Sequence, residues 1–131
     1  MISPQTNKYL ESSIQTASPA QLLIMLCDGA IRFCKLSVED IKKLDYIAAN
    51  EHIGKVQDII NEFIITLDRS SPIAEGLLKL YDYFMYLLIQ ANTKKDIQPI
   101  QEVIGYLGEL KETWFQAARQ TNSQKPGAQY G

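Results

Sequence analysis

Residues 16–34 read TASPAQLLIMLCDGAIRFC, and this stretch decides the fold because a helix start leads directly into a long apolar run. Ser18 can cap a helix N-terminus, Pro19 suits the first helical position, and Gln21 can complete a capping box. Apolar residues then recur at helical spacing as far as Leu44. The stretch therefore predicts a long amphipathic helix that begins at Ser18.

Three more helices are predicted by similar signals. Asp45 resembles the N-cap of a second helix, Ser71 before Pro72 repeats the serine-proline start for a third, and Asp96 is placed to cap a fourth. Apolar residues follow at helical spacing: Ile53, Val56, Ile60 and Phe63, then Leu77, Leu80, Phe84 and Leu88, then Ile100, Val103, Leu107, Leu110 and Trp114. Long helices joined by short turns favour antiparallel neighbours. The predicted fold is all-α, an antiparallel up-down-up-down four-helix bundle over residues 18–118.

Both ends of the chain are expected to lie outside this bundle. Residues 1–17 are polar apart from Ile2, Tyr9, Leu10 and Ile14, and we expect them to form a short N-terminal strap over the bundle. Residues 119–131 have almost nothing to bury, so we expect a disordered C-terminal tail.

Composition excludes several functional classes. The 131 residues carry a formal net charge of −2 and no basic stripe, which disfavours binding to nucleic acid. No apolar run approaches the length of a membrane span, so membrane insertion is not expected. The N-terminus lacks the basic and apolar regions of a signal peptide, which indicates a cytoplasmic protein.

The residues that carry catalysis or bind metals are also sparse. His52 is the only histidine and has no partner at metal-ligand spacing, so we expect a solvated surface residue. Cys27 and Cys34 lie on one face of one predicted helix, about 10 Å apart along its axis, too far for a disulfide. Asp28 interrupts an apolar segment and is expected to have a structural role. The sequence predicts neither an enzyme nor a cofactor or metal site.

Two segments are more apolar than one buried helix face requires. Residues 22–27 are apolar all the way round, residues 83–89 are apolar or aromatic throughout, and residues 96–118 keep the single stripe expected of a bundle helix. Exposed apolar patches usually mark partner sites, and a groove between helices can take an amphipathic segment of another protein. The alternative is that these two helices are simply the most buried of the four.

The chain also resembles a known family. Tyr9 and Ile14 before residues 16–19 (TASP) and 22–31 (LLIMLCDGAI) are similar to the N-terminal signature of the FliS flagellar secretion chaperones, which usually have tyrosine where Cys27 stands. Residues 56–60 (VQDII), 80–85 (LYDYFM), 91–92 (AN) and 110–114 (LKETW) agree as well. The resemblance covers residues 8 to 118 in unbroken order.

The resemblance implies a four-helix bundle in the bacterial cytosol that binds the C-terminal segment of flagellin. It implies that binding prevents premature polymerisation and assists delivery to the flagellar type III export apparatus, with export-gate components as further partners. The predicted partner-binding residues are Tyr9, Leu10, Ile14, Leu22, Met25, Leu26, Tyr81, Tyr83, Met85, Tyr86, Leu87 and Asn92. The sequence does not distinguish a monomer from a weak dimer. A helical adaptor or regulatory protein that uses the same hydrophobic grooves for a different partner is the alternative function.

Overall fold

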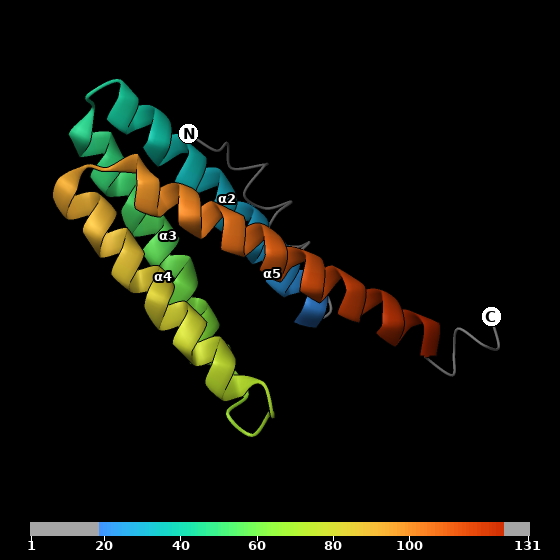
Figure 1. The fold of residues 1–131 in the computed structure, drawn as a ribbon. Helices are drawn as coiled ribbons and strands as arrows, with labels where there is room; N and C mark the ends of the chain where they lie inside the picture. Colours follow the sequence, from blue (N-terminus) through green and yellow to red (C-terminus); the bar gives the residue numbers. More distant parts are fainter. Residues whose placement is uncertain (1–18, 125–131) are drawn as a thin grey trace, which may run out of the picture.

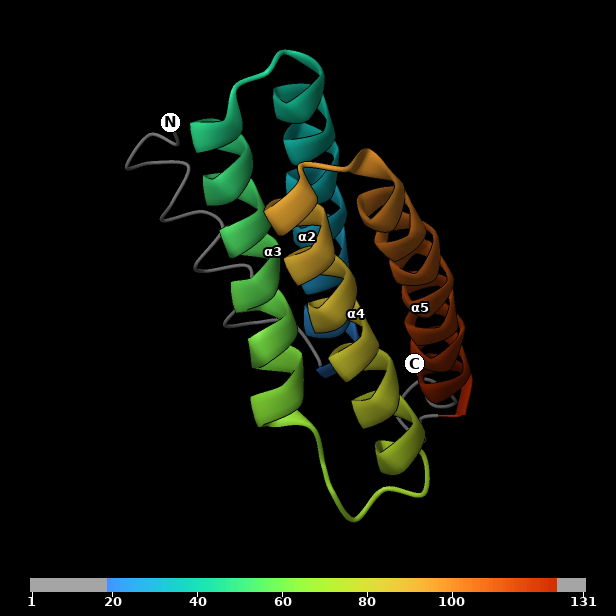
Figure 2. The ribbon, with the colours of Figure 1, turned by 60° about the vertical axis from the view of Figure 1, so that its left-hand side comes forward.

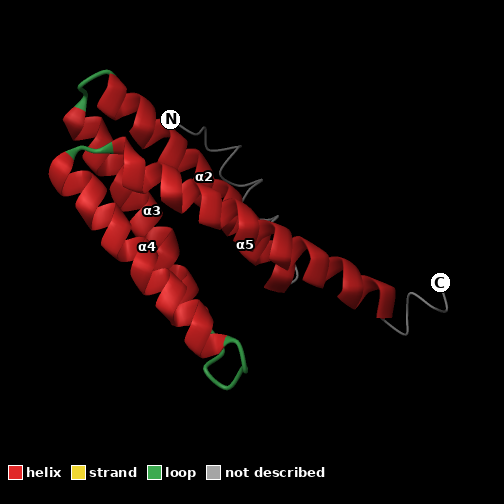
Figure 3. Ribbon diagram, viewed as in Figure 1, coloured by secondary structure: helices red, strands yellow, loops and turns green. Residues whose placement is uncertain are grey.

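The computed structural model describes residues 19–124, and every regular element within that range is an α-helix (Figure 3). The helices are α2 (Pro19–Lys42), α3 (Tyr46–Thr66), α4 (Ala74–Lys94) and α5 (Ile97–Gln124). The predicted all-α class is confirmed.

The four helices form a bundle in which each helix packs against two others. Helix α2 lies between α3 and α5, and α4 packs against the same two helices from the other side (Figures 1 and 2). Helices that follow one another in the chain run in opposite directions, because the loops between them are short. The predicted up-down-up-down arrangement is confirmed.

Two of the predicted helix caps are present. The Asp45 carboxylate accepts a hydrogen bond from the Ala48 amide at 3.1 Å, and the Asp96 carboxylate accepts one from the Gln98 amide at 3.0 Å. Each satisfies an amide that the first turn of a helix leaves without a backbone partner. The turn before Asp45 contains Leu44 in a left-handed conformation, with φ of 61°.

The predicted serine-proline start of the third helix is wrong. Helix α4 begins at Ala74, and its N-cap residue Ile73 makes no side-chain capping bond. Ser71 lies in a turn ahead of the helix, where its carbonyl accepts from the Ala74 amide at 3.0 Å. The Asp68 carboxylate accepts from the Ser70 amide and hydroxyl, which bends the chain at this loop.

The C-terminal helix is longer than predicted. Helix α5 continues past Ala118 to Gln124, so the boundary proposed at residue 118 was placed too early. Residues 119–124 have little to bury, but they contain neither proline nor glycine, and the first such residue is Pro126. Residues 119–124 therefore contain no residue that would interrupt the helix.

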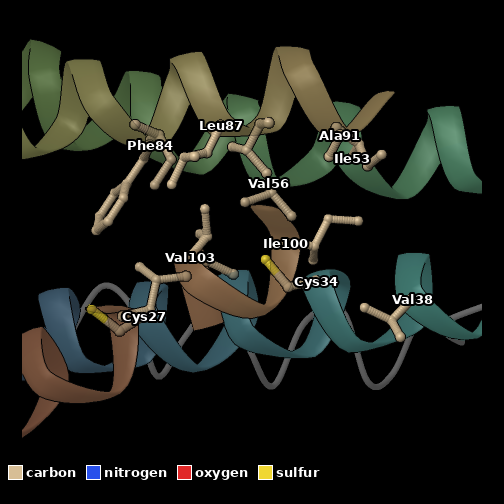
Figure 4. Packing of buried hydrophobic residues seen from close by; sticks show 14 of the residues in the cluster. Cys27, Cys34, Val38, Ile53, Val56, Phe84, Leu87, Ala91, Ile100 and Val103 are labelled. Carbon is tan, nitrogen blue, oxygen red and sulfur yellow. The ribbon is translucent and has the colours of Figure 1, made fainter. Parts of the chain in front are cut away.

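The core contains side chains from all four helices (Figure 4). Fully buried members include Cys27 and Cys34 from α2, Phe63 from α3, Phe84 from α4 and Leu107 from α5. Both cysteines are free thiols, and burial raises the pKa of each to about 12. They pack as small apolar side chains within the core.

Two polar contacts tie α2 to its neighbours. Asp28 forms the predicted structural contact, with its Oδ1 2.7 Å from Lys111 Nζ on α5. His52 is not the solvated residue that the sequence suggested: its Nδ1 lies 2.5 Å from Asp40 Oδ2, and its ring stacks on Phe33. The stack and the carboxylate lie on α2, so the histidine joins α3 to that helix.

Candidate protein-binding surface

The bundle carries a groove of about 280 Å³ at the end where the α3–α4 loop lies. All four helices and the loop contribute to its wall, which consists of Leu23, Phe63, Thr66, Leu67, Asp68, Ser71, Ile73, Leu77, Tyr81 and Trp114. The groove is mainly apolar, and Asp68 is the only charged residue that lines it. We call this feature the apolar groove.

Helix divergence accounts for the position of the apolar groove. The loop end of the α3–α4 pair lies apart from the later turns of α5 (Figure 1). Helix α4 packs less closely against α3 and α5 than α2 does. Leu77 on α4 and Trp114 on α5 therefore stay half-buried rather than meeting in a closed core.

Trp114 contributes a buried indole N–H to the wall of the apolar groove. Its Nε1 is buried and has no hydrogen-bond partner within the part of the chain that the structure describes. A buried donor left without a partner costs about 1–3 kcal/mol. Trp114 is also the only tryptophan in the chain, so its fluorescence reports on this groove alone.

A second surface lies on the seam between α4 and α5, where three tyrosines are exposed. The Tyr83 ring stacks against that of Tyr86 with centroids 6.4 Å apart, and meets the Tyr106 ring edge-on at 6.1 Å. The Tyr83 hydroxyl donates to Glu102 Oε2, and this hydrogen bond raises the pKa of the phenol to about 12. We call Tyr83, Tyr86, Tyr106 and Glu102 the tyrosine face.

The aromatic rings connect the two surfaces. Phe63 and Tyr81, which line the apolar groove, have ring centroids 5.3 Å apart. Tyr81 contacts Phe84 in the core at 6.4 Å, and Phe84 contacts Tyr106 of the tyrosine face at 6.2 Å. Both surfaces thus rest on one continuous set of aromatic contacts that fixes α4 against α3 and α5.

The predicted site residues divide into several groups. Tyr83 and Tyr86 are exposed and therefore accessible on the surface of the bundle. Leu22, Met25, Leu26 and Met85 are half-buried, and Leu26 and Met85 pack on the core. The Asn92 amide donates to Asn50 Oδ1 on α3 at 2.7 Å and accepts from Lys95 Nζ, so it joins two helices. Tyr9, Leu10 and Ile14 lie outside the described residues.

Two of the predicted partner-binding residues lie in the core. Tyr81 is 1% exposed and Leu87 is 6% exposed, so neither side chain is open on the surface of the free bundle. Phe84, Leu88 and Ala91 define the inner side of α4, and Leu87 lies close enough to that side to be covered. Tyr81 still borders the apolar groove from the core side.

Several surface residues were missed. Tyr106 and Phe115 are exposed on α5, although the sequence predicted a single buried stripe for that helix. Leu23, Phe63 and Leu77 line the apolar groove but read as ordinary core positions. Their helical spacing could not indicate that they line a groove. A groove forms where two helices diverge, whereas residue spacing describes only one helix.

Ionisable clusters do not suggest a different kind of site. Within residues 19–124 no group of three or more His, Cys, Asp and Glu side chains is placed to hold a metal ion. No helix in the same range is long and apolar enough to cross a membrane.

The fold and these two surfaces define a class: a four-helix bundle with an apolar groove at one end and an exposed aromatic face on one side. Comparison with known proteins identifies the family. A family model described as "Flagellar protein FliS" matches residues 1–121, so the chain belongs to the FliS family of flagellar secretion chaperones, which are not enzymes.

Curated relatives agree along most of their length. The chain is 33% identical to the flagellar secretion chaperone FliS of Bacillus subtilis over 120 residues, covering 92% of this chain and 90% of the relative. It is 34% identical to FliS of Salmonella typhimurium over 119 residues, covering 88% of each chain. The FliS of Vibrio cholerae is 30% identical over 109 residues, covering 82% of this chain and 80% of the relative.

Proposed function

We propose that this chain is the export chaperone of flagellin and acts in the bacterial cytosol. It binds the C-terminal segment of flagellin, prevents premature polymerisation, and assists delivery to the flagellar type III export apparatus. Export-gate components then interact with the flagellin-loaded chaperone. Membership of the FliS family supports the chaperone role, and the apolar groove is the structural observation that carries the proposal.

The physical reason lies in what flagellin must avoid before export. A protein that polymerises through apolar helix faces has to keep those faces covered until it leaves the cell. A groove lined by Leu23, Leu77 and Trp114 can take one apolar side of an amphipathic helix. If the client segment orders only on binding, the ordering cost lowers the net affinity, which suits a carrier that must release its client.

The N-terminal strap belongs to the same proposal. We expect the segment around Tyr9 and Ile14 to lie near the client site and to rearrange when the client binds. Alanine at both positions should change flagellin affinity while the free energy of unfolding stays nearly constant. Equal affinity of the double variant and the wild type would remove the strap from the account.

Titration calorimetry of the full chain with the C-terminal segment of its cognate flagellin tests the proposed function. We expect saturable binding with a negative heat-capacity change, because apolar surface is buried. An intact bundle that gives no binding heat at several temperatures would contradict the proposal, and would favour the helical adaptor.

A further inference from the structure

Carboxylates on and beside the tyrosine face form no ion pair within the described chain. Glu102, Tyr106 and Glu109 follow one another on one side of α5 at helical spacing, and Asp82 lies one turn before Tyr86 on α4. All three carboxylates belong to exposed residues, and none forms an ion pair with a lysine or arginine among residues 19–124. Lys79, the nearest cation along α4, is paired with Glu75 at 3.5 Å.

The geometry of this face is ordered rather than loose. The Tyr83 hydroxyl holds the Glu102 carboxylate beside its own ring, and the Tyr106 ring meets Tyr83 at an interplanar angle of 76°. Aromatic faces carry negative charge density and attract cations within about 6 Å of the ring centre, arginine more often than lysine. A carboxylate next to such rings adds an acceptor that can take two hydrogen bonds from one guanidinium. Because these groups are already positioned, little side-chain entropy is lost on binding.

The face is also close to the apolar groove. Tyr83 lies about 9 Å along α4 from Leu77, and Tyr106 lies about 12 Å along α5 from Trp114. Three or four extended residues span this rise along the axis, and a few more are needed to pass around α4, because Leu77 and Tyr83 point about 120° apart. One bound polypeptide can therefore fill the groove with apolar side chains and cross the tyrosine face with the residues that follow or precede them.

We propose that the tyrosine face, together with Asp82 and Glu109, binds a cationic stretch of the same client segment that fills the apolar groove. The inference rests on the proposed function and adds the chemistry that the client must carry: arginine or lysine within a few residues of its apolar anchors. The apolar groove supplies most of the buried surface, and the tyrosine face fixes the register and direction of the client.

Salt dependence of binding tests this proposal, because exposed charge pairs are screened and apolar contacts are not. The test variant is D82N/E102Q/E109Q, and the matched control is E51Q/D58N/E62Q, which removes the same charge from exposed positions on α3. The probe is the C-terminal segment of the cognate flagellin, and its affinity is measured by titration calorimetry at about 50 mM and about 500 mM salt.

We expect wild-type affinity to fall about tenfold over that range, the test variant to fall less than about twofold, and the control to follow the wild type. A probe whose arginines and lysines are replaced by glutamine should bind the wild type and the test variant equally. Loss of the salt dependence in both triple variants would assign it to the overall charge of the chain and overturn the proposal. A flagellin segment that lacks arginine and lysine would overturn it as well.

The failure of this inference is distinguishable from failure of the proposed function. If the wild type binds the segment and D82N/E102Q/E109Q binds it equally at both salt concentrations, the tyrosine face has no such role and the apolar groove stands alone. If the wild type does not bind the segment at either salt concentration, the proposed function fails and this inference fails with it.

Discussion

Four buried or hydrogen-bonded acids hold their protons more tightly in the folded chain than they would in water. Desolvation raises the pKa of Cys27, Cys34 and Tyr81 to about 12, with the charge of Asp28 adding to the effect on Cys27. The hydrogen bond to Glu102 does the same for Tyr83. The ordinary pKa of the thiols is 9.0 and that of the phenols is 10.0. Above these values the unfolded chain loses protons that the folded chain keeps.

Stability should therefore fall on the alkaline side. The contribution of the two thiols is complete below pH 9.0 and is lost as pH rises toward about 12, by up to about 1.4 kcal/mol per pH unit for each thiol. Urea denaturation at pH 8, 9 and 10 measures this slope. The variant C27A/C34A should be less stable at pH 8 but should lose less stability between pH 9 and 10. Parallel curves for both proteins would show that thiol ionisation has no part in the decline.

Leu44 has a backbone conformation that should lower the free energy of unfolding. Its φ is 61°, a left-handed backbone conformation that costs a residue with a Cβ about 1–2 kcal/mol. Its side chain buries little, because 72% of the residue surface is exposed. Leu44→Gly should raise the free energy of unfolding by about 0.5–1 kcal/mol, because it removes the strain and loses little burial. Lys43→Gly, one residue earlier and without a positive φ, is the control and should lower stability. If L44G is less stable than the wild type, while K43G loses stability as predicted, the positive φ of Leu44 does not strain the turn.

At the scale of the helices, α2 and α4 differ in how firmly they are held. Helix α2 buries Cys27, Ala30, Cys34, Ser37, Val38 and Ile41 along most of its length and packs closely on both neighbours. Helix α4 starts at Ala74, and its N-cap residue Ile73, which lines the apolar groove, makes no side-chain capping bond. The part of α4 that borders the groove is the less firmly held of the two.

Amide hydrogen exchange should show this difference. Amides in the first two turns of α4 should exchange faster than those around Cys34 in α2, because local opening there breaks fewer buried contacts. Saturation with the flagellin segment should slow exchange at the start of α4 more than in α2. Equal protection of both regions in the free protein would contradict the description of α4.

The sequence predicted helices better than it predicted the surfaces between them. Asp45 and Asp96 are local signals, since a carboxylate at a helix start meets amides only a few residues away. Ser71 carried the same kind of signal, but the Asp68 carboxylate bonds the Ser70 amide and forms a turn there. The helix therefore begins later, at Ala74. Local chemistry therefore fixed which segments are helical and left the boundary open by a few residues.

The candidate site depends on azimuth and on neighbouring helices, which are harder to predict. Residues 83–89 are apolar in every direction, so their pattern could not separate the exposed Tyr83 and Tyr86 from the buried Leu87. Tyr106 joins the tyrosine face only because α5 places it against Tyr83. The expected surplus of apolar surface is present on α4, whereas residues 22–26 of α2 are half-buried and Cys27 is buried. Helix α3 adds Ile47 and Ile65, which the sequence did not single out.

At the scale of the whole molecule, the apolar groove and the tyrosine face make the bundle a support around which another chain can fold. The groove lies where the helices diverge, and the tyrosine face lies on the seam where α4 and α5 meet. In the proposed function, a bound client would gain order from the bundle, and the bundle would gain cover for apolar and aromatic surface that its own four helices leave accessible. In the proposed function, the client fills the apolar groove.

Trp114 fluorescence during titration with a tryptophan-free flagellin segment tests that claim most directly, because Trp114 is the only tryptophan of the chain and lines the groove. The variants are Leu77→Lys, which puts a charge into the groove, and Ile65→Lys, which puts one on α3 at a residue that does not line the groove. We predict that emission shifts and saturates on binding to the wild type and to I65K, and that L77K weakens binding about tenfold or more. Tight binding that leaves Trp114 emission unchanged and is equally strong for L77K would contradict the account.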